Sequence, residues 1–274
     1  MRPTPPIAGV IGWPVAHSKS PLIHRFWLER LGIDGEYGRF PVAPERLVEA
    51  MGALAALGFA GVNVTVPHKL AVMDCVDVID AGARDVGAVN VVQVMPDGAL
   101  HGHNSDVAGI CEPLQRRALA GREVVLVGSG GAARAAMAAF VRLGTARVTI
   151  LARDPAKGRA LLEGFGMDGQ VLPMDAAEAK WGAPALLFNA SVLGMTGQPA
   201  FVPDMARLPD DMMVFDAVYA PLETPLLAAA RARGLAVIDG LEMLIGQAAM
   251  GFALFFGAEA PRGEDAALRA RLLK

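Results

Sequence analysis

The chain has 274 residues, a formal net charge of −3 and 53% hydrophobic residues. At roughly 150 residues per domain this length predicts two domains, and the charge leaves no basic footprint for nucleic acid. The longest apolar runs, near residues 53–62 and 248–258, are interrupted by glycine and fall short of the roughly 18 residues that cross a membrane. The N-terminus is too rich in proline to resemble a signal peptide. We therefore expect a cytoplasmic protein that binds a small molecule, but neither nucleic acid nor a membrane.

The first third of the chain alternates short strands with helices. Residues 7–11 predict an apolar strand, and Ser20-Pro21 predicts a helix start, with Ser20 as N-cap and Pro21 at the first helical position. An apolar stripe continues this helix to Gly32, where we expect it to end. Further elements are expected as a strand at 37–41, a helix at 44–57, a strand at 61–66, and a hairpin of residues 88–95 and 100–104 around Pro96-Asp97-Gly98.

The strand at 61–66 carries an unusual polar face. Val62, Val64 and Val66 alternate with Asn63 and Thr65, so an amide and a hydroxyl share one side of the strand. Pro67 then ends the strand and places His68 and Lys69 just beyond its carboxyl end, where open α/β sheets usually bind ligands. These groups suit a small polyhydroxylated substrate. A solvated edge strand is the alternative interpretation.

From residue 123 onward the pattern changes to short apolar runs separated by helical stretches, which is typical of a doubly wound parallel sheet. The runs lie at 123–127, 147–151, 169–172, 185–189, 213–217 and 236–238, and two helices follow at about 241–256 and 263–273. We predict an α/β protein with two domains. A mixed α/β substrate domain is formed by residues 1–104 and the returning C-terminal segment 241–274, and a Rossmann-like domain by residues 105–240.

A glycine-rich turn opens the second domain. The strand at 123–127 runs into Gly128-Ser129-Gly130-Gly131-Ala132-Ala133 and then into an alanine-rich helix, the G-x-G-x-x-A pattern of a dinucleotide site. A tight turn without a ligand is the alternative. The next strand ends at Arg153, with Lys157 and Arg159 following, and these cations favour the 2′-phosphate of NADP(H) over NAD. Asp154 is expected to cap the following helix, with Pro155 at its first position, rather than to bind a ribose.

Other reactive residues are less informative. His101 and His103 would share one face of a strand, but no further ligands occur at metal-binding spacing, so we expect no metal site. Cys75 and Cys111 are far apart and are expected to be buried apolar thiols. Met195 and Met243 suggest core filling.

The order of these motifs resembles that of the shikimate dehydrogenases over nearly the whole chain. The resemblance is carried by the segments Gly12–His24, Asn63–Lys69, Gly87–Asn90, Gly102–Gly109, the glycine turn, Asn189–Met195, Asp216–Pro221 with Thr224-Pro225, and Gly240–Gln247. It implies a reversible, NADPH-dependent reduction of 3-dehydroshikimate to shikimate in aromatic amino-acid (chorismate) biosynthesis, by a monomer or homodimer.

The resemblance also implies roles for individual residues. Lys69 and Asp106 would form the catalytic pair, and the sequence leaves open which of them holds the proton. Ser18 and Ser20 would bind the substrate carboxylate, which agrees with a helix N-terminus at Ser20. The other substrate-binding residues would be Asn63, Thr65, Asn90, Tyr219 and Gln247. The cofactor-binding residues would be Gly128, Ser129, Gly130, Gly131, Ala132, Arg153, Lys157, Val218, Gly240 and Met243, the last as a wall for the nicotinamide.

Four positions depart from the family pattern: Arg25 for the usual Asn, Ser105 for Thr, Ala152 for Asn and Ser191 for Thr. Only Arg25 adds a charge, near the expected carboxylate end, and it could alter substrate preference. Two alternatives stay open. One is a paralogue acting on quinate or an aminated analogue; the other is a catalytically silent regulator that binds the cofactor, against which the presence of both Lys69 and Asp106 argues.

Overall fold

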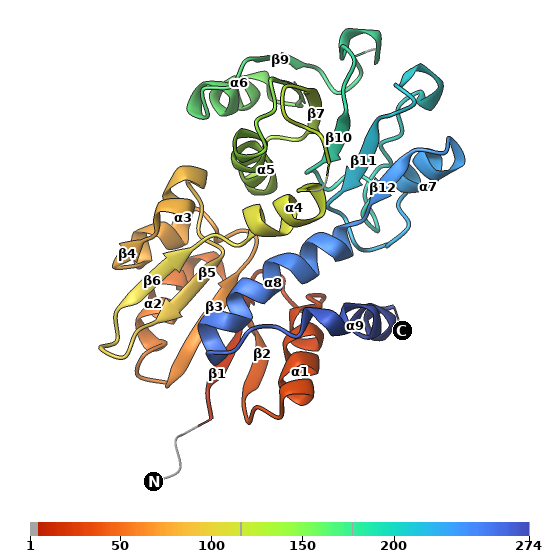
Figure 1. Cartoon of the computed structure of the whole chain (residues 1–274). Coiled ribbons are helices and arrows are strands. Elements are labelled where there is room, and N and C mark those ends of the chain that lie inside the picture. Colours follow the sequence, from red (N-terminus) through yellow and green to blue (C-terminus); the bar gives the residue numbers. More distant parts are fainter. Residues whose placement is uncertain (1–4, 116, 177, 274) are drawn as a thin grey trace. The chain divides into compact units, whose positions relative to one another are not determined.

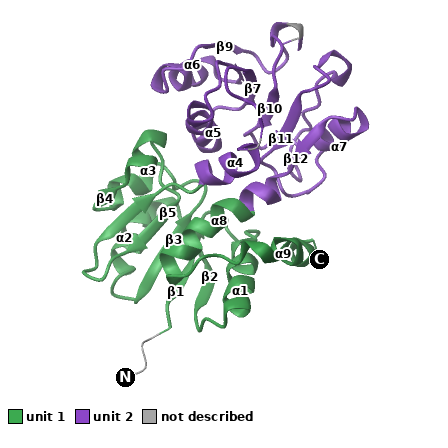
Figure 2. Ribbon diagram, viewed as in Figure 1, with its two compact units in different colours: residues 1–105, 245–274 green, residues 106–244 purple. Residues whose placement is uncertain are grey.

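The computed structural model describes residues 5–115, 117–176 and 178–273. The chain divides into two compact units, which Figure 2 shows in different colours: residues 1–105 with 245–274 form unit 1, and residues 106–244 form unit 2. Part of the proline-rich start, residues 1–4, lies outside the described residues. The C-terminal helices return to the first unit, and the return occurs inside a continuous helix rather than at its start.

Unit 1 contains a mixed six-stranded sheet of order β2-β1-β3-β5-β6-β4 (Figure 1). Its strands are β1 (Ile7–Gly12), β2 (Glu36–Pro41), β3 (Phe59–Val64), β4 (Val78–Ile79), β5 (Val91–Val94) and β6 (Leu100–His103). Strand β1 pairs parallel with β2 and β3, whereas β5 pairs antiparallel with β3 and β6. Since β3 lies between β1 and β5, the alternative that residues 61–66 form a solvated edge strand is wrong.

The helices of unit 1 are α1 (Ser20–Leu31), α2 (Leu47–Ala53), α3 (Ala81–Val86), the later part of α8 (Gly240–Phe256) and α9 (Asp265–Leu272), with 3₁₀ turns at Pro44–Arg46, Ala71–Cys75 and Arg262–Glu264. Two of them, α1 and α8, have nearly the predicted bounds, whereas those expected at 44–57 and 263–273 are shorter. The single helix expected over 44–57 is instead a 3₁₀ turn followed by α2. Helix α2 ends at Ala53, and the turns that follow it reach Gly58, which has a left-handed φ of 73°, and the Phe59 N–H, which donates to the Leu54 carbonyl.

The two faces of the unit 1 sheet follow the alternation of the strand residues. Ile11, Val62 and Val64 face the core that contains Leu47 and Met51 of α2. The opposite face carries Ala8, Val10, Tyr37 and Val91 and packs against Phe255 of α8. A Cβ on Gly61 would overlap the Phe255 ring and the Val92 carbonyl oxygen, so glycine at 61 lets α8 lie directly on β3.

Unit 2 is a six-stranded, fully parallel sheet of order β12-β11-β10-β7-β8-β9. Its strands are β7 (Glu123–Val127), β8 (Arg147–Leu151), β9 (Gly169–Leu172), β10 (Leu186–Asn189), β11 (Met213–Asp216) and β12 (Ala236–Ile238). Its helices are α4 (Asp106–Leu114), α5 (Gly131–Arg142), α6 (Pro155–Gly164), α7 (Pro225–Ala232) and the start of α8, with 3₁₀ turns at Glu178–Lys180 and Met205–Arg207.

The topology of unit 2 is the predicted doubly wound one. The strand order reverses between β7 and β10, and the carboxyl ends of strands on either side of such a reversal form the usual ligand-binding crevice of this fold. Among the described residues, no helix is long and apolar enough to cross a membrane.

Candidate functional site

In unit 1, one edge of the sheet gathers several of the expected substrate residues. The carboxyl ends of β1 and β3 lie at this edge, since Ile11 is in register with Val64. The antiparallel pairing brings the start of β5 and the end of β6 to the same edge, because Val91 pairs with both Asn63 and His103. The residues that follow β1, β3 and β6 and that precede β5 therefore meet here.

The expected carboxylate site lies after β1, in the loop that enters α1. Ser18 is buried, its hydroxyl lies 3.2 Å from that of Ser20, and it accepts a hydrogen bond from the Ser20 N–H. The prediction that Ser20 is the N-cap is wrong: Lys19 is the N-cap, and Ser20 is the first helical residue. Because Ser18 takes part of the capping role, the Ser20 hydroxyl is not needed as a cap.

Tyr37 is a residue of this region that the sequence reasoning missed. Its ring is fully buried on β2, and its hydroxyl donates a 2.6 Å hydrogen bond to Asn63 Oδ1 on β3. Burial raises the pKa of Tyr37 well above its usual value, and a hydrogen bond with Ser20 opposes this shift. Tyr37 thus interacts with Ser20, expected at the carboxylate, and with Asn63, expected at a ring hydroxyl. The sequence signal was its position in a strand beside β1.

A second aromatic ring, that of His24 on α1, stacks on Tyr37. The centroid distance is 3.9 Å, and the angle between the ring planes is 8°. His24 is fully buried, neither of its ring nitrogens has a hydrogen-bond partner, and desolvation lowers its pKa to about 3. His24 is therefore a neutral packing residue rather than an acid or base.

The turn after β3 separates His68 from Lys69. His68 is buried, and its Nε2 lies 2.7 Å from the Val42 carbonyl, so it holds two loops together and is not presented with Lys69. Lys69 is half-buried, and its carbonyl accepts a hydrogen bond from the Val89 N–H, which places its backbone beside the segment that leads to Asn90. Thr65, also half-buried, stays in register with β1 through a hydrogen bond from its N–H to the Ile11 carbonyl.

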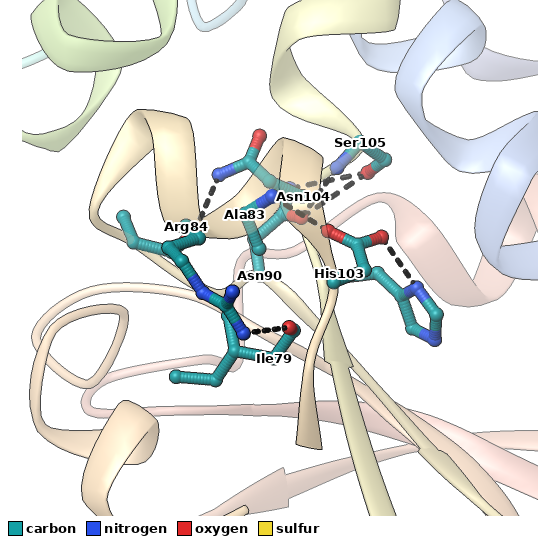
Figure 3. Close-up of polar contacts among 9 residues, drawn as sticks. Ile79, Ala83, Arg84, Asn90, His103, Asn104 and Ser105 are labelled. Carbon is teal, nitrogen blue, oxygen red and sulfur yellow. Dashed lines mark hydrogen bonds and ion pairs between the residues drawn. The ribbon is translucent and has the colours of Figure 1, made fainter.

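Asn90 and Ser105 form a buried pair at the same edge, shown in Figure 3. The Ser105 N–H donates to Asn90 Oδ1 at 2.8 Å, and Asn90 Nδ2 donates to the Ser105 hydroxyl at 3.1 Å. The adjacent Asn104 donates to the Ala88 carbonyl at 2.9 Å. These contacts fix the chain just before Asp106, which is buried and is the first residue of α4.

The substitution of Ser for the usual Thr at position 105 keeps this pairing, because only a hydroxyl is needed.

Figure 3 also shows the His103 ring, whose Nδ1 lies 2.7 Å from Asp80 Oδ2. Asp80 also caps α3 by accepting from the Ala83 N–H. His103 thus pairs with an acidic side chain rather than with His101, and the described residues contain no group of three or more His, Cys, Asp or Glu able to hold a metal ion.

Gln247 lies in the part of α8 that belongs to unit 1. It is half-buried and lies one helical turn before Gly251, against which Asn63 packs. A Cβ on Gly251 would lie 3.1 Å from Asn63 Nδ2, so glycine at this position leaves room for the amide. Helix α8 therefore covers the polar face of β3 next to the edge that carries the other candidate substrate residues.

In unit 2, the glycine turn follows β7 at the reversal of strand order. Gly128 has a left-handed φ of 104°, and a Cβ there would lie 3.2 Å from Ser191 Cβ in the loop after β10. Gly130 precedes α5, and a Cβ on it would meet nothing within 4 Å. The turn thus approaches its neighbouring loop closely at Gly128 and leaves open space at the helix N-terminus, which suits a pyrophosphate.

The end of β8 has the predicted arrangement of charges. Asp154 is the N-cap of α6, where it accepts hydrogen bonds from the N–H groups of Ala156 and Lys157, and Pro155 opens the helix. This confirms Asp154 as a cap. Arg153, Lys157 and Arg159 are exposed around it, available to a phosphate.

A buried polar network shapes the loops after β10 and β11. Asp216 accepts hydrogen bonds from Asn189 Nδ2, the Thr224 hydroxyl and the Val218 N–H, and burial raises the pKa of its carboxyl group. The network fixes the backbone of Val218, next to Tyr219. Tyr219 is half-buried, and desolvation raises the pKa of its hydroxyl. The sequence identified these residues only as parts of the family motifs and did not predict their hydrogen bonds.

Gly240 lies against the same loop. A Cβ on Gly240 would overlap the Ala217 and Val218 carbonyl oxygens, so glycine is required at the start of α8. Met243, one turn further on, is buried, in agreement with core filling, whereas Met195 is 37% exposed and does not fill a core. Cys75 and Cys111 are half-buried rather than buried, and desolvation raises the pKa of both thiols.

Comparison with known proteins decides the family. The shikimate dehydrogenase substrate-binding domain matches residues 10–92, and the shikimate 5′-dehydrogenase C-terminal domain matches residues 240–266. The shikimate dehydrogenase (NADP(+)) of Sphingopyxis alaskensis is 50% identical over 98% of this chain and 97% of its own length. The chain belongs to the shikimate dehydrogenase family. A second member, from Rhodospirillum rubrum, is 48% identical over 97% of this chain and 96% of its own length.

Solved structures of the family share the fold. Shikimate 5-dehydrogenase from Thermus thermophilus, in complex with NADP(H) and shikimate, is 36% identical, with a TM-score of 0.86 over 98% of this chain and 100% of that one. Quinate dehydrogenase from Corynebacterium glutamicum, in complex with NAD, is 31% identical, with a TM-score of 0.88 over 97% of this chain and 99% of that one. The fold is therefore common to enzymes named for different substrates.

Proposed function

We propose that this chain is an NADP-dependent shikimate dehydrogenase, which reversibly reduces 3-dehydroshikimate to shikimate in aromatic amino-acid (chorismate) biosynthesis. The observation that carries the proposal is the polar edge of the unit 1 sheet. It gathers a pair of serine hydroxyls, the half-buried Asn63 that accepts a hydrogen bond from Tyr37, and the buried Asn90. A carboxylate and several ring hydroxyls are what such a set recognises. The curated relatives support the same assignment, since they are 40–50% identical and carry that name.

In this proposal Ser18 and Ser20 bind the substrate carboxylate at the N-terminus of α1, where helix N–H groups favour an anion. The ring hydroxyls are bound by Asn63, Thr65, Asn90, Tyr219 and Gln247. Tyr37 donates to Asn63 Oδ1, so the amide nitrogen of Asn63 is the group left to donate to a substrate oxygen.

Lys69 and Asp106 are proposed as the catalytic pair at the carbonyl oxygen. In the reducing direction the Lys69 ammonium polarises the ketone, and the oxygen receives a proton from the Lys69–Asp106 pair as the carbon receives a hydride. In the oxidising direction the same pair removes the hydroxyl proton. Burial of Asp106 and its fixed place at the start of α4 suit a residue that must be held in one orientation.

The residues of unit 2 fit NADP(H), which supplies the hydride when bound. The pyrophosphate would lie on the turn Gly128–Ala132, where Gly130 borders open space, and Arg153 with Lys157 would bind the 2′-phosphate. Asp154 is already engaged as a helix cap, which disfavours its use as a ribose ligand for NAD. Val218, Gly240 and Met243 would border the nicotinamide.

The test is a panel of substrates and cofactors. Purified protein should oxidise NADPH with 3-dehydroshikimate, and reduce NADP+ with shikimate, at a kcat/KM at least about tenfold above that with NADH or NAD+. Quinate with NAD+ is the competing pair, because a quinate dehydrogenase shares the fold. Faster turnover of quinate would replace the proposed substrate, and no turnover with any pair would leave a cofactor-binding regulator.

We also propose that the enzyme works in the cytoplasm, where NADPH is supplied, as a monomer or homodimer. Light scattering of the purified protein across a range of concentrations would distinguish these two states.

A further inference from the structure

Arg39, on β2, binds the loop between β1 and α1, which carries the two serines expected at the substrate carboxylate. Its Nε and Nη2 atoms donate to the same acceptor, the Ser18 carbonyl oxygen, at 2.9 and 2.6 Å. The two donors of one planar guanidinium thus converge on one backbone atom, and side-chain rotation cannot break one bond without weakening the other. No motif in the sequence had pointed to Arg39.

Arg39 and Tyr37 lie on the same strand, and each of them bonds a residue of the candidate substrate site. The two residues lie two positions apart on β2, so their side chains leave the same face of the strand. Tyr37 reaches Asn63, and Arg39 reaches Ser18. Strand β2 therefore supplies two contacts to the substrate edge, one at each expected end of the substrate.

The loop is also held from its other side. Lys19 Nζ donates to the Leu272 carbonyl at the end of α9, so the segment Ser18–Ser20 is fixed between β2 and the C-terminal helix. The two anchors differ in kind. Lys19 points its charge toward the end of α9, whereas Arg39 brings a guanidinium to the peptide that carries the Ser18 hydroxyl, and within the described part of the chain no carboxylate forms an ion pair with it.

We propose that Arg39 is a positioning residue for substrate binding: by chelating the Ser18 carbonyl it orients the Ser18 and Ser20 hydroxyls toward the substrate carboxylate and keeps an unneutralised positive charge beside that anion. This inference rests on the proposed function. Its consequences are specific, because Arg39 should influence the affinity for the anionic substrate and should leave the hydride-transfer step and the cofactor untouched.

Two substitutions separate geometry from charge. Arg39→Lys keeps the positive charge but cannot donate two bonds in one plane, and Arg39→Gln removes the charge. We expect the KM for shikimate to rise about threefold in Arg39→Lys and about tenfold or more in Arg39→Gln, with kcat and the KM for NADP+ within about twofold of wild type. Raising the ionic strength should increase the shikimate KM of the wild type and of Arg39→Lys more than that of Arg39→Gln.

Arg25→Gln is the matched control. Arg25, on α1, is exposed like Arg39, but its Nη2 lies 4.0 Å from Glu36 Oε2 and its side chain is not bonded to Ser18. It should leave the shikimate KM within about threefold of wild type. A shift in Arg39→Gln no larger than that of Arg25→Gln, or a loss of kcat at constant KM, would overturn the proposal.

A measurement that does not depend on turnover distinguishes the positioning role of Arg39 from the proposed function. Hydrogen exchange of a peptide covering residues 13–22 should become faster in Arg39→Lys than in Arg25→Gln, whatever the enzyme's substrate, because the loop loses one of its two anchors. If wild type does not turn over shikimate, the proposed function fails while faster exchange still supports the anchoring role. If wild type is active and neither the exchange nor the KM changes, the Arg39 inference alone fails. If Arg39→Gln does not fold, the hydrogen exchange of Arg39→Lys against that of Arg25→Gln decides.

Discussion

The hydroxyl of Tyr37 and the amide oxygen of Asn63 lie 2.6 Å apart, and this hydrogen bond joins residues that are 26 positions apart in the chain. It orients an asparagine on a central strand by means of a tyrosine two strands away. We expect Tyr37→Phe to lower the free energy of unfolding by about 1–2 kcal/mol, because Asn63 loses its donor. The KM for shikimate should rise roughly three- to tenfold, or about 0.7–1.4 kcal/mol, in steady-state kinetics. An unchanged KM would assign Tyr37 to stability alone.

The buried His24 makes stability depend on pH. Its pKa is about 3 in the folded protein against 6.5 in the unfolded chain, so the unfolded state binds more protons between these values. Stability is therefore fully present above pH 6.5 and falls as the pH drops toward 3, by up to about 4–5 kcal/mol. Urea unfolding at pH 5 and pH 8 measures this loss.

His24→Phe should remove this contribution, because the replacement ring cannot be protonated and its edge needs no hydrogen-bond partners. The variant should gain stability relative to wild type at pH 5 and less at pH 8. His17→Gln, at an exposed position, should keep the wild-type dependence. Equal pH slopes for wild type and His24→Phe would show that other groups cause the acid sensitivity.

Lys69→Ala should lower kcat by roughly 10²–10⁴, or about 3–5 kcal/mol of barrier, the usual scale of acid–base catalysis. Asp106→Asn should behave similarly, and the double variant should lose less than the product of the two, because the residues act as a unit. Lys157→Ala is the control, since it should change only the KM for NADPH. If Lys69→Ala raises KM at constant kcat, the lysine binds substrate without transferring a proton.

Arg153→Ala should raise the KM for NADPH about tenfold and leave that for NADH nearly unchanged, because a charge-assisted hydrogen bond to the 2′-phosphate contributes about 1.5–3 kcal/mol. Arg159→Ala, further along α6, should have a smaller effect. A wild type that prefers NADH would contradict this assignment and require a second role for Asp154 besides capping.

Arg25→Asn restores the family's usual residue and should change the shikimate KM by less than about threefold. The Arg25 head group lies 4.0 Å from Glu36, and the two side chains are 58% and 73% exposed, so solvent screens the charge. Steady-state rates measured over a range of shikimate concentrations, for wild type and for Arg25→Asn, give the two KM values. A tenfold rise would mean that Arg25 contacts the carboxylate.

The sequence predicted the elements that depend on local patterns. Gly32 ends α1 in a left-handed conformation, Asp154 caps α6, and the strands at 123–127, 147–151 and 169–172 have the expected bounds. Each of these rests on a residue type with one dominant conformational use. The glycine turn was recognisable for the same reason, since its pattern lies between a strand and a helix.

The sequence missed the exact start of α1 and several features that depend on distant neighbours. Ser20 has the chemistry of an N-cap, but Ser18 bonds its N–H, so the helix begins one residue earlier. His68 was expected beside Lys69, yet it turns to the Val42 carbonyl. Tyr37 and Arg39 act across the sheet on Asn63 and Ser18, and only the strand order places them within reach.

Helix α8 begins in unit 2 and ends in unit 1, where Gly251 and Phe255 cover the middle of a sheet built from the first 105 residues. A chain emerging from the ribosome therefore makes the strands of its first sheet well before the helix that covers them, because the whole of unit 2 lies between. Unit 2, a continuous stretch, can finish pairing in between. A polypeptide that lacked the residues from 245 onward would leave the apolar sheet face of Ala8, Val10 and Val91 without the cover of Phe255, and such a face invites aggregation.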